Sequence, residues 1–293
     1  MLIETLSTFP HMYDSVMGES MMKRAQEKGI LEFRAHDLRD WTHDRHRTTD
    51  DDPYGGGAGL VMKCDPIFEA VEAILGKEFV EAKLASAMGE SAPGGLASSS
   101  TMVEFGGDAG CPDRASSAAP QIVFLAPQGR PFDDAYADKL AAADHLLFIC
   151  GHYEGIDERV YTLADHVISL GDYVLTSGEL ASMVVIDAAV RKLPGVLGAA
   201  EGPVDESFTS GLLEYPQYTR PADFRGMRVP EVLTSGNHAA IARWRREQSL
   251  ARTAAARPDL IAAAEAAGRL TPADQKFLKL LEPAPTGAAE GVS

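Results

Sequence analysis

Three short apolar segments decide the fold: QIVFLAP at residues 121–127, LLFICG at residues 146–151 and HVISLGDY at residues 166–173. Near-continuous apolar runs of this length, bounded by proline or glycine, are typical of parallel strands that are covered on both faces. Residues 132–143, between the first two segments, follow a proline and begin with acidic residues, which favours a helix. These segments therefore predict an α/β fold with a parallel sheet.

Strands and helices already alternate before these segments. Apolar patterns predict a strand at residues 2–6, a helix near residues 12–17, a second strand near residues 30–33 and a helix over residues 66–75. Residues 81–119 are rich in alanine, serine and glycine and cannot supply much core. We expect them to form a flexible surface insertion.

The pattern after the last apolar segment sets the domain boundaries. A helical stripe over residues 178–193 closes a first domain that we place at residues 1–198. Residues 199–214 resemble an interdomain linker, because glycine and acidic residues dominate their first part. Residues 215–283 are expected to form a smaller, all-helical domain, and residues 284–293 a disordered tail.

Composition bounds the class of protein. The chain has 293 residues, of which 45% are hydrophobic and 24% charged, so it can bury a sizeable core and is not a wholly disordered chain. No apolar run is long enough to cross a bilayer, and the first residues lack a signal-peptide pattern. We expect a cytoplasmic protein with no membrane partner. The three cysteines lie far apart, which argues against both a disulfide framework and a zinc site.

Charge is segregated along the chain. The net charge is −16, which taken alone disfavours a nucleic-acid partner. Residues 215–260, however, contain eight arginines, four acidic residues and no lysine. Arginine without lysine is consistent with planar recognition of phosphates or bases, and also with a genome rich in arginine codons.

The three apolar segments end in glycine-containing turns: APQGRP, CGHYEGIDER and SLGDYVLTSGEL. Ligands of open α/β sheets gather outside the carboxyl ends of the strands, so these turns define one candidate pocket. No metal site is predicted. His36, His43 and His46 come nearest to one, and the string HDRHR is better explained as a polar loop.

The chain resembles a known family in several long strings: PYGGGAGLVM, APQGRPF, CGHYEGIDERV, LGDYVLTSGEL, LPGVLG, SFTSGLLEYPQYTRP and PEVLTSGNHAAIARWRREQSL. In combination they are similar to the bacterial tRNA (guanine-N1)-methyltransferases, the TrmD-like members of the knotted SPOUT superfamily. The resemblance implies a deep trefoil knot in the first domain and an S-adenosyl-L-methionine cofactor. It also implies a homodimer with its active site at the subunit interface. The implied substrate is tRNA, methylated at N1 of the guanine at position 37, just 3′ of the anticodon.

The resemblance implies that the three turns hold the cofactor. The residues that it implicates are Leu125, Pro127, Gln128, Gly129, Gly151, Tyr153, Glu154, Leu170, Gly171, Asp172, Tyr173, Val174, Leu175 and Gly178. Taken alone, each string is equally consistent with an ordinary turn. The family usually has arginine in place of His152 and glycine in place of Ser177.

Two groups are expected to carry the chemistry. Guanine N1 holds a proton, so methylation needs a general base and a cation or donor near O6. In the family the base is an aspartate immediately before Ser-Phe; here that position is Glu206, with Asp205 one residue upstream. Either carboxylate can serve, and Arg191 is the expected electrostatic partner. Without the resemblance, these residues would pass for linker acids and a helix C-terminal cation.

Four arginines are candidates for phosphate contacts: Arg220, Arg243, Arg245 and Arg246. Trp244 can stack on a base or anchor the core.

Two alternatives to a methyltransferase stay open at this point. One is a catalytically impaired RNA-binding or cofactor-sensing protein on the same scaffold, and the other is a nucleotide-binding enzyme of conventional doubly wound topology.

Overall fold

The computed structural model describes residues 1–89, 119–197 and 206–281. The chain divides into two compact units, Met1–Gly202 and Pro203–Ser293. The boundary lies close to the predicted end of the first domain.

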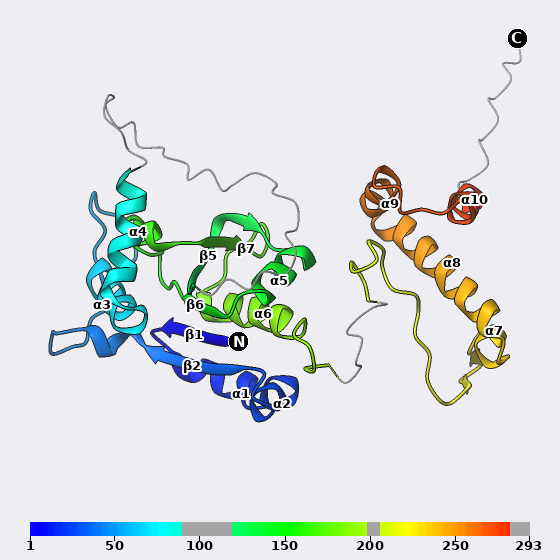
Figure 1. Cartoon of the computed structure of the whole chain (residues 1–293), viewed down its shortest axis with the longest axis horizontal. Coiled ribbons are helices and arrows are strands. Elements are labelled where there is room, and N and C mark those ends of the chain that lie inside the picture. Colours follow the sequence, from blue (N-terminus) through cyan, green and yellow to red (C-terminus); the bar gives the residue numbers. More distant parts are fainter. Residues whose placement is uncertain (90–118, 198–205, 282–293) are drawn as a thin grey trace, which may run out of the picture. The chain divides into compact units, whose positions relative to one another are not determined.

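A five-stranded parallel sheet forms the centre of the first unit (Figure 1). Its strands, in chain order, are β1 (Leu2–Ser7), β2 (Glu32–Asp37), β5 (Gln121–Pro131), β6 (His145–Ile149) and β7 (His166–Ser169). In space they follow the order β2-β1-β6-β5-β7. The two common doubly wound orders do not place the third strand between the fourth and the fifth. The conventional doubly wound alternative is therefore wrong.

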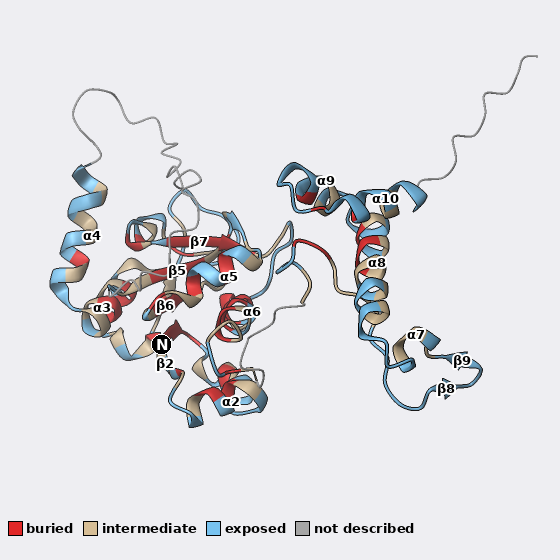
Figure 2. Cartoon of the chain, turned by 45° about the vertical axis from the view of Figure 1, so that its right-hand side comes forward, coloured by how far each residue is buried: buried red, intermediate tan, exposed pale blue. Residues whose placement is uncertain are grey.

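Both faces of the sheet are buried, as the apolar strand segments predict. Along β6, Leu146 and Phe148 belong to the core on one face, whereas Leu147 and Ile149 belong to the core on the other. Successive side chains of a strand point to opposite faces, so a continuous apolar run requires cover on both sides. Figure 2 shows this burial along the central strands.

Short helices cover one face of the sheet. They are η1 (Pro10–Tyr13), α1 (Asp14–Met17), α2 (Ser20–Glu27), α5 (Asp134–Ala141) and α6 (Gly178–Val190). The helix expected near residues 12–17 is thus divided into a 3-10 turn and one α-helical turn. The start of α5 is fixed by Asp133, whose carboxylate accepts a hydrogen bond from the backbone N–H of Tyr136.

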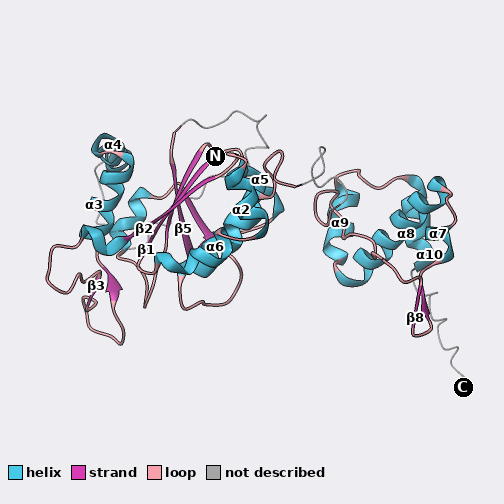
Figure 3. Ribbon diagram, turned by 90° about the horizontal axis from the view of Figure 1, so that it is seen from below, coloured by secondary structure: helices cyan, strands magenta, loops and turns pink. Residues whose placement is uncertain are grey.

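The opposite face is covered by η2 (Leu38–Trp41), α3 (Cys64–Leu75), α4 (Lys77–Gly89) and η3 (Glu158–Leu163). Figure 3 shows α3 and α4 on one side of the strands and α2, α5 and α6 on the other. A small antiparallel pair, β3 (Asp50–Asp51) with β4 (Val61–Met62), frames the glycine-rich loop before α3.

Two boundaries and the burial of one residue differ from the sequence predictions. The expected insertion began at residue 81, but α4 continues to Gly89, because its alanine, glutamate, lysine and leucine residues favour a helix. The rest of the predicted insertion lies outside the described residues. The strand predicted at residues 166–173 is β7, which ends at Ser169, and Gly171 then takes a φ of 147° that favours glycine. Leu180 of α6, which the apolar stripe expected over residues 178–193 assigns to the core, is 43% exposed.

The second unit contains α7 (Glu231–Thr234), α8 (His238–Ala256), α9 (Pro258–Ala266) and α10 (Pro272–Leu281). Leu212, Leu250, Ala264 and Leu270 form its core. The all-helical prediction is wrong in one detail, because β8 (Asp223–Phe224) and β9 (Met227–Arg228) form a small hairpin. The predicted tail lies outside the described residues.

Candidate functional site

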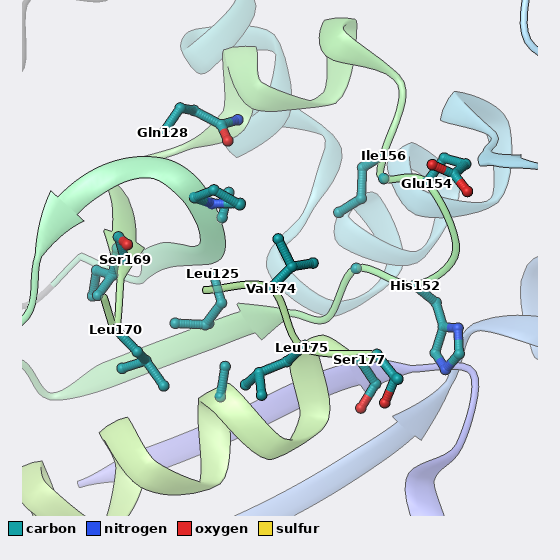
Figure 4. A pocket seen from close by; sticks show the side chains of 18 of the residues that line it. Leu125, Gln128, His152, Glu154, Ile156, Ser169, Leu170, Val174, Leu175 and Ser177 are labelled. Atoms are coloured by element: carbon teal, nitrogen blue, oxygen red, sulfur yellow. The ribbon is translucent and has the colours of Figure 1, made fainter. Parts of the chain in front are cut away.

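A cleft of about 310 Å³ lies at the carboxyl ends of β5, β6 and β7. Three turns line it, at residues 126–130, 150–157 and 170–178, and we call it the three-turn cleft (Figure 4). Its volume falls within the range of roughly 300–1,000 Å³ that is usual for small-molecule sites. The predicted pocket therefore exists where the strand pattern placed it.

The first turn is a bulge within β5. Leu125 and Arg130 both pair with Ile168 of β7, so the residues between them loop out of the sheet. A side chain at Gly129 would lie only 2.5 Å from the backbone nitrogen of Ile168. Gly129 therefore lets the end of the bulge pack directly against β7, and it does not line the cleft itself.

The second turn rests on the glycine-rich loop PYGGGAGLVM. The backbone N–H of Glu154 donates to the carbonyl of Leu60 at 3.1 Å. The Glu154 side chain fills the space above Gly59, where a Cβ would lie 2.3 Å from the Glu154 Cγ. Tyr153 has a φ of 59°, which is unusual for a residue other than glycine. The loop thus fixes the conformation of the second turn.

The third turn is joined to the second at its end. The Gly178 N–H donates to the Gly151 carbonyl at 2.7 Å, and His152 and Ser177 form an antiparallel bridge. A Cβ on Gly178 would lie 2.7 Å from the Gly151 nitrogen. Close approach of the two backbones therefore requires glycine at position 178 but tolerates Ser177 beside it.

A buried polar cluster supports the joined turns from below. Ser7 of β1 donates to Glu179 at 2.5 Å, and the Tyr13 hydroxyl lies 2.7 Å from that of Ser182. Burial raises the pKa of the neighbouring Cys150 thiol to about 12, and the Glu179 carboxylate adds to the shift. Cys150 is therefore an unreactive thiol that packs beneath the site.

The cleft suits a ligand that is partly apolar and partly polar. Leu125 and Leu170 pack against the core on the α6 side, and Ile156 belongs to the opposite core. Burial also raises the pKa of Tyr161, so its hydroxyl stays protonated. Ser177 carries a buried hydroxyl without a hydrogen-bond partner among the described residues. Apolar walls and a buried, unpaired hydroxyl fit a nucleoside carrying a polar chain.

The structure brings together most of the predicted cofactor residues. Gly129 and Asp172 do not line the cleft, and all the others do. The prediction missed Ile156, Tyr161 and Ser169, which also line it. The string EGIDER contains Ile156, but no local pattern singled out Tyr161, whose place in the cleft depends on the packing of η3.

The predicted catalytic residues belong to different units. Arg191 is the C-cap of α6 in the first unit, and its N–H donates to the Asp187 carbonyl. Glu206 is half-buried at the start of the second unit, whereas Asp205 lies outside the described residues. The joint role of these residues stays a prediction.

Two other features concern ions and membranes. Within the described ranges, no three histidine, cysteine, aspartate or glutamate residues could hold a metal ion. His36 contacts Glu4 at 2.9 Å and His43 contacts Glu69 at 2.7 Å. None of the described helices has the length and apolar character needed to span a bilayer.

The four predicted RNA-contacting arginines have different surroundings. Arg246 forms a two-pronged pair with the buried Asp274, at 3.1 and 2.9 Å. Arg243 only approaches Glu247, at 3.9 Å, and is 78% exposed. Arg246 thus has a structural partner, whereas the side chains of Arg220, Arg243 and Arg245 are exposed at the surface.

The parallel sheet and the three-turn cleft define an α/β protein with a small-molecule cleft at the carboxyl ends of its strands. Residues 1–105 and 92–263 match the family model "tRNA (Guanine-1)-methyltransferase TrmD". The chain belongs to this family.

Curated relatives cover nearly the whole chain. A tRNA (guanine-N(1)-)-methyltransferase of Symbiobacterium thermophilum is 48% identical over 279 residues, 95% of this chain and 97% of the relative. Proteins of the same name from Limosilactobacillus reuteri and Geobacillus kaustophilus are 48% and 47% identical. They cover 90% and 89% of this chain, and the alignments span 91% of each relative.

Proposed function

We propose that this protein transfers a methyl group from S-adenosyl-L-methionine to N1 of the guanine at position 37 of tRNA. The observation that carries the proposal is the three-turn cleft, found in a chain of the TrmD family. The cleft has the size, the apolar walls and the turn backbone that an adenosine-containing ligand needs.

The cofactor supplies an activated methyl group on a sulfonium. The protein has to bind it, orient it and exclude water. Leu125, Leu170 and Leu175 would provide apolar contacts for the adenosine. Glu154, held by the glycine-rich loop, would provide a carboxylate for the amino group.

A carboxylate near residue 206 acts as the general base. It would remove the proton from N1 and so prepare N1 to accept the methyl group that the cofactor supplies. Negative charge that develops on O6 is stabilised by the guanidinium of Arg191. Glu206 is one methylene longer than the aspartate of the family, which would displace its carboxylate by about one bond length.

The chain around Glu206 is held by the second unit. Ser207 accepts a hydrogen bond from the Glu214 N–H at 2.9 Å, and Leu213 donates to Thr253 of α8 at 2.9 Å. Positioning of the base is therefore coupled to the helical unit, which supports a role for that unit in presenting the RNA.

The family fold implies a deep trefoil knot in the first unit. The strand order, with β5 between β6 and β7, supports it. The joining of the third turn to Gly151 supports it as well, because the chain returns to the turn after β6 once it has left β7.

We infer a homodimer with an active site between subunits. Apolar side chains are exposed on the first unit: Val174 of the third turn is 82% exposed, and Leu180 and Val184 of α6 are 43% and 54% exposed. Leu180 and Val184 lie one helical turn apart and share a face. Exposed apolar side chains on one helix face support contact with a second copy. A tRNA substrate supports a cytoplasmic location, which we propose as well.

Methyl transfer to unmodified tRNA tests the proposal. The wild-type chain, Glu206→Gln, Asp205→Asn and Glu206→Asp are assayed with labelled cofactor. Loss of a general base lowers the rate by about 10²–10⁴-fold, so one of the two amide variants should show that loss. Glu206→Asp should stay active if Glu206 is the base, because the carboxylate remains.

The outcomes separate the proposed enzyme from a binding protein. Full activity in both amide variants contradicts the assignment of the base. No transfer by the wild-type chain, with cofactor and tRNA both bound, favours the catalytically impaired reading instead.

A further inference from the structure

A second cleft, of about 400 Å³, lies within the helical unit. One wall is the extended segment 215–222, and the other is formed by Leu233 and Thr234 of α7 together with the first half of α8. From α8 it receives Ile241, Trp244 and Arg245, which share one helix face. We call it the aromatic cleft.

Its aromatic side chains form a surface on which a flat ring can stack. The rings of Tyr218 and Trp244 lie 6.4 Å apart at a tilt of 52°. The Arg245 guanidinium lies over the ring of Tyr215, 4.7 Å from its centroid. Tyr218 is 49% exposed, so part of this surface is open to a ligand.

The cleft is positively charged. Arg220 and Arg245 line it, and no described aspartate or glutamate does. Neither arginine forms an ion pair within residues 206–281, whereas Arg246 pairs with Asp274 and Arg257 with Asp259. Unpaired guanidinium groups beside aromatic rings suit a phosphate attached to a base.

Hydrogen bonds fix the wall made by the extended segment. Leu213 donates to Thr253, and Arg252 donates to the Glu214 carbonyl at 3.0 Å. At the other end of the wall, the Val229 N–H donates to the Ala222 carbonyl at 2.9 Å. The cleft is therefore held open by the fold of the unit.

We propose that the aromatic cleft binds one unstacked nucleotide of the RNA substrate, with its base on Tyr218 and Trp244 and its phosphate at Arg220. Recognition of single-stranded RNA commonly uses bases splayed out onto aromatic and arginine planes. The inference rests on the proposed function, because that function makes RNA the substrate. It adds a nucleotide site separate from the three-turn cleft that holds the methyl donor.

Binding of the full-length protein to an unmodified tRNA anticodon stem-loop tests the inference. The variants are Tyr218→Ala, Trp244→Phe and Arg220→Gln, with Arg257→Gln as the matched loss of one arginine outside the cleft. Fluorescence anisotropy gives each affinity over a range of salt concentrations. Thermal unfolding and S-adenosyl-L-methionine binding check that each variant is folded.

Tyr218→Ala should weaken RNA binding by roughly 5- to 100-fold, the usual loss for one stacked base. Trp244→Phe keeps a ring and should lose much less. Arg220→Gln should lower the salt slope by about one, as loss of one phosphate contact does, and Arg257→Gln should not.

RNAs with one abasic loop nucleotide identify the bound base. One such abasic RNA should bind the wild-type protein more weakly than the intact RNA does. The same abasic RNA and the intact RNA should bind Tyr218→Ala with equal affinity. Equal affinity of Tyr218→Ala and the wild type overturns the inference. A changed oligomeric state of Tyr218→Ala at unchanged RNA affinity also overturns it and assigns the cleft to contact between copies.

Failure of the inference is distinguishable from failure of the proposed function. Methyl transfer by the wild-type protein with normal RNA affinity of Tyr218→Ala rejects only the aromatic cleft. The predicted loss of affinity, in a protein that transfers no methyl group, supports the cleft and rejects the enzyme.

Discussion

Backbone shapes the three-turn cleft, whereas side chains shape the aromatic cleft. In the first, glycines let turns approach one another or a strand, and Gly178 and Gly151 are in direct contact through a hydrogen bond. In the second, tyrosines, Trp244 and arginines project from an extended segment and from α8. A site shaped by close backbone contacts should lose ligand affinity when a glycine gains a methyl group. A site shaped by side chains should lose affinity when one of those side chains is truncated.

The largest effect is expected for Gly178→Ala. The new Cβ would lie 2.7 Å from the Gly151 nitrogen and 3.0 Å from the Cys150 Cα, so the second and third turns must separate. We expect about a 100-fold loss of methyl transfer, because a displacement of about 1 Å at a reacting centre has that effect. Calorimetric titration with S-adenosyl-L-methionine should show a parallel loss of affinity.

Gly89→Ala is the matched substitution, because nothing lies within 4 Å of its Cβ position. It should bind the cofactor as the wild type does. Normal cofactor affinity in Gly178→Ala would contradict the claim that backbone contacts shape the three-turn cleft, since the contact between the second and third turns would then be dispensable.

A smaller effect is expected for Arg246→Ala, which compares a buried-pair arginine of the helical unit with the exposed Arg243. This change removes both hydrogen bonds to the buried Asp274 and should cost about 1–3 kcal/mol of that unit's stability. Arg243→Ala, at a 78% exposed side chain, should change stability by less than about 0.5 kcal/mol and instead weaken RNA binding.

Trp244 fluorescence in a Trp41→Phe background follows unfolding of the helical unit, because the chain has one tryptophan in each unit. Equal stability of the two arginine variants would show that the pair with Asp274 has no structural role.

A further prediction concerns the stability of the first unit, which should fall at acidic pH because of His166. Burial lowers the pKa of His166 to about 4, and its ring contacts the Tyr136 hydroxyl at 2.9 Å and Gln121 at 2.8 Å. The folded protein thus holds the neutral ring, while the unfolded chain takes up a proton near pH 6.5. The stabilisation is present above pH 6.5 and is lost as pH falls towards 4, by about 2–3 kcal/mol.

Urea unfolding between pH 7 and pH 4, followed by Trp41 fluorescence in a Trp244→Phe background, measures this loss. His166→Gln should show a flatter dependence on pH. An unchanged slope in that variant would mean that other groups cause the acid sensitivity of the first unit.

Local patterns predicted the parts of the fold that depend on burial. The apolar runs of β5, β6 and β7 gave the parallel sheet, and the turns after them gave the cleft. The strand order was not predictable, because neighbouring runs do not say that β5 lies between β6 and β7. The resemblance, and not periodicity, supplied the cofactor residues.

Packing gives two of the predicted site residues a structural contact that the sequence did not show. Gly129 was expected at the cofactor, but its missing side chain serves the contact with β7. Arg246 looked like its neighbour Arg243 in sequence, yet only Arg246 faces the buried Asp274. The aromatic cleft was not predicted as a cleft, because Tyr215 and Tyr218 lie in an extended segment without a periodic pattern.

The most direct test of the central claim is nucleoside analysis of unmodified tRNA after incubation with the protein and methyl-labelled S-adenosyl-L-methionine. We predict labelled 1-methylguanosine next to the anticodon with the wild type and Gly89→Ala, and almost none with Gly178→Ala. Label on another atom, or equal yields from all three proteins, would contradict the account.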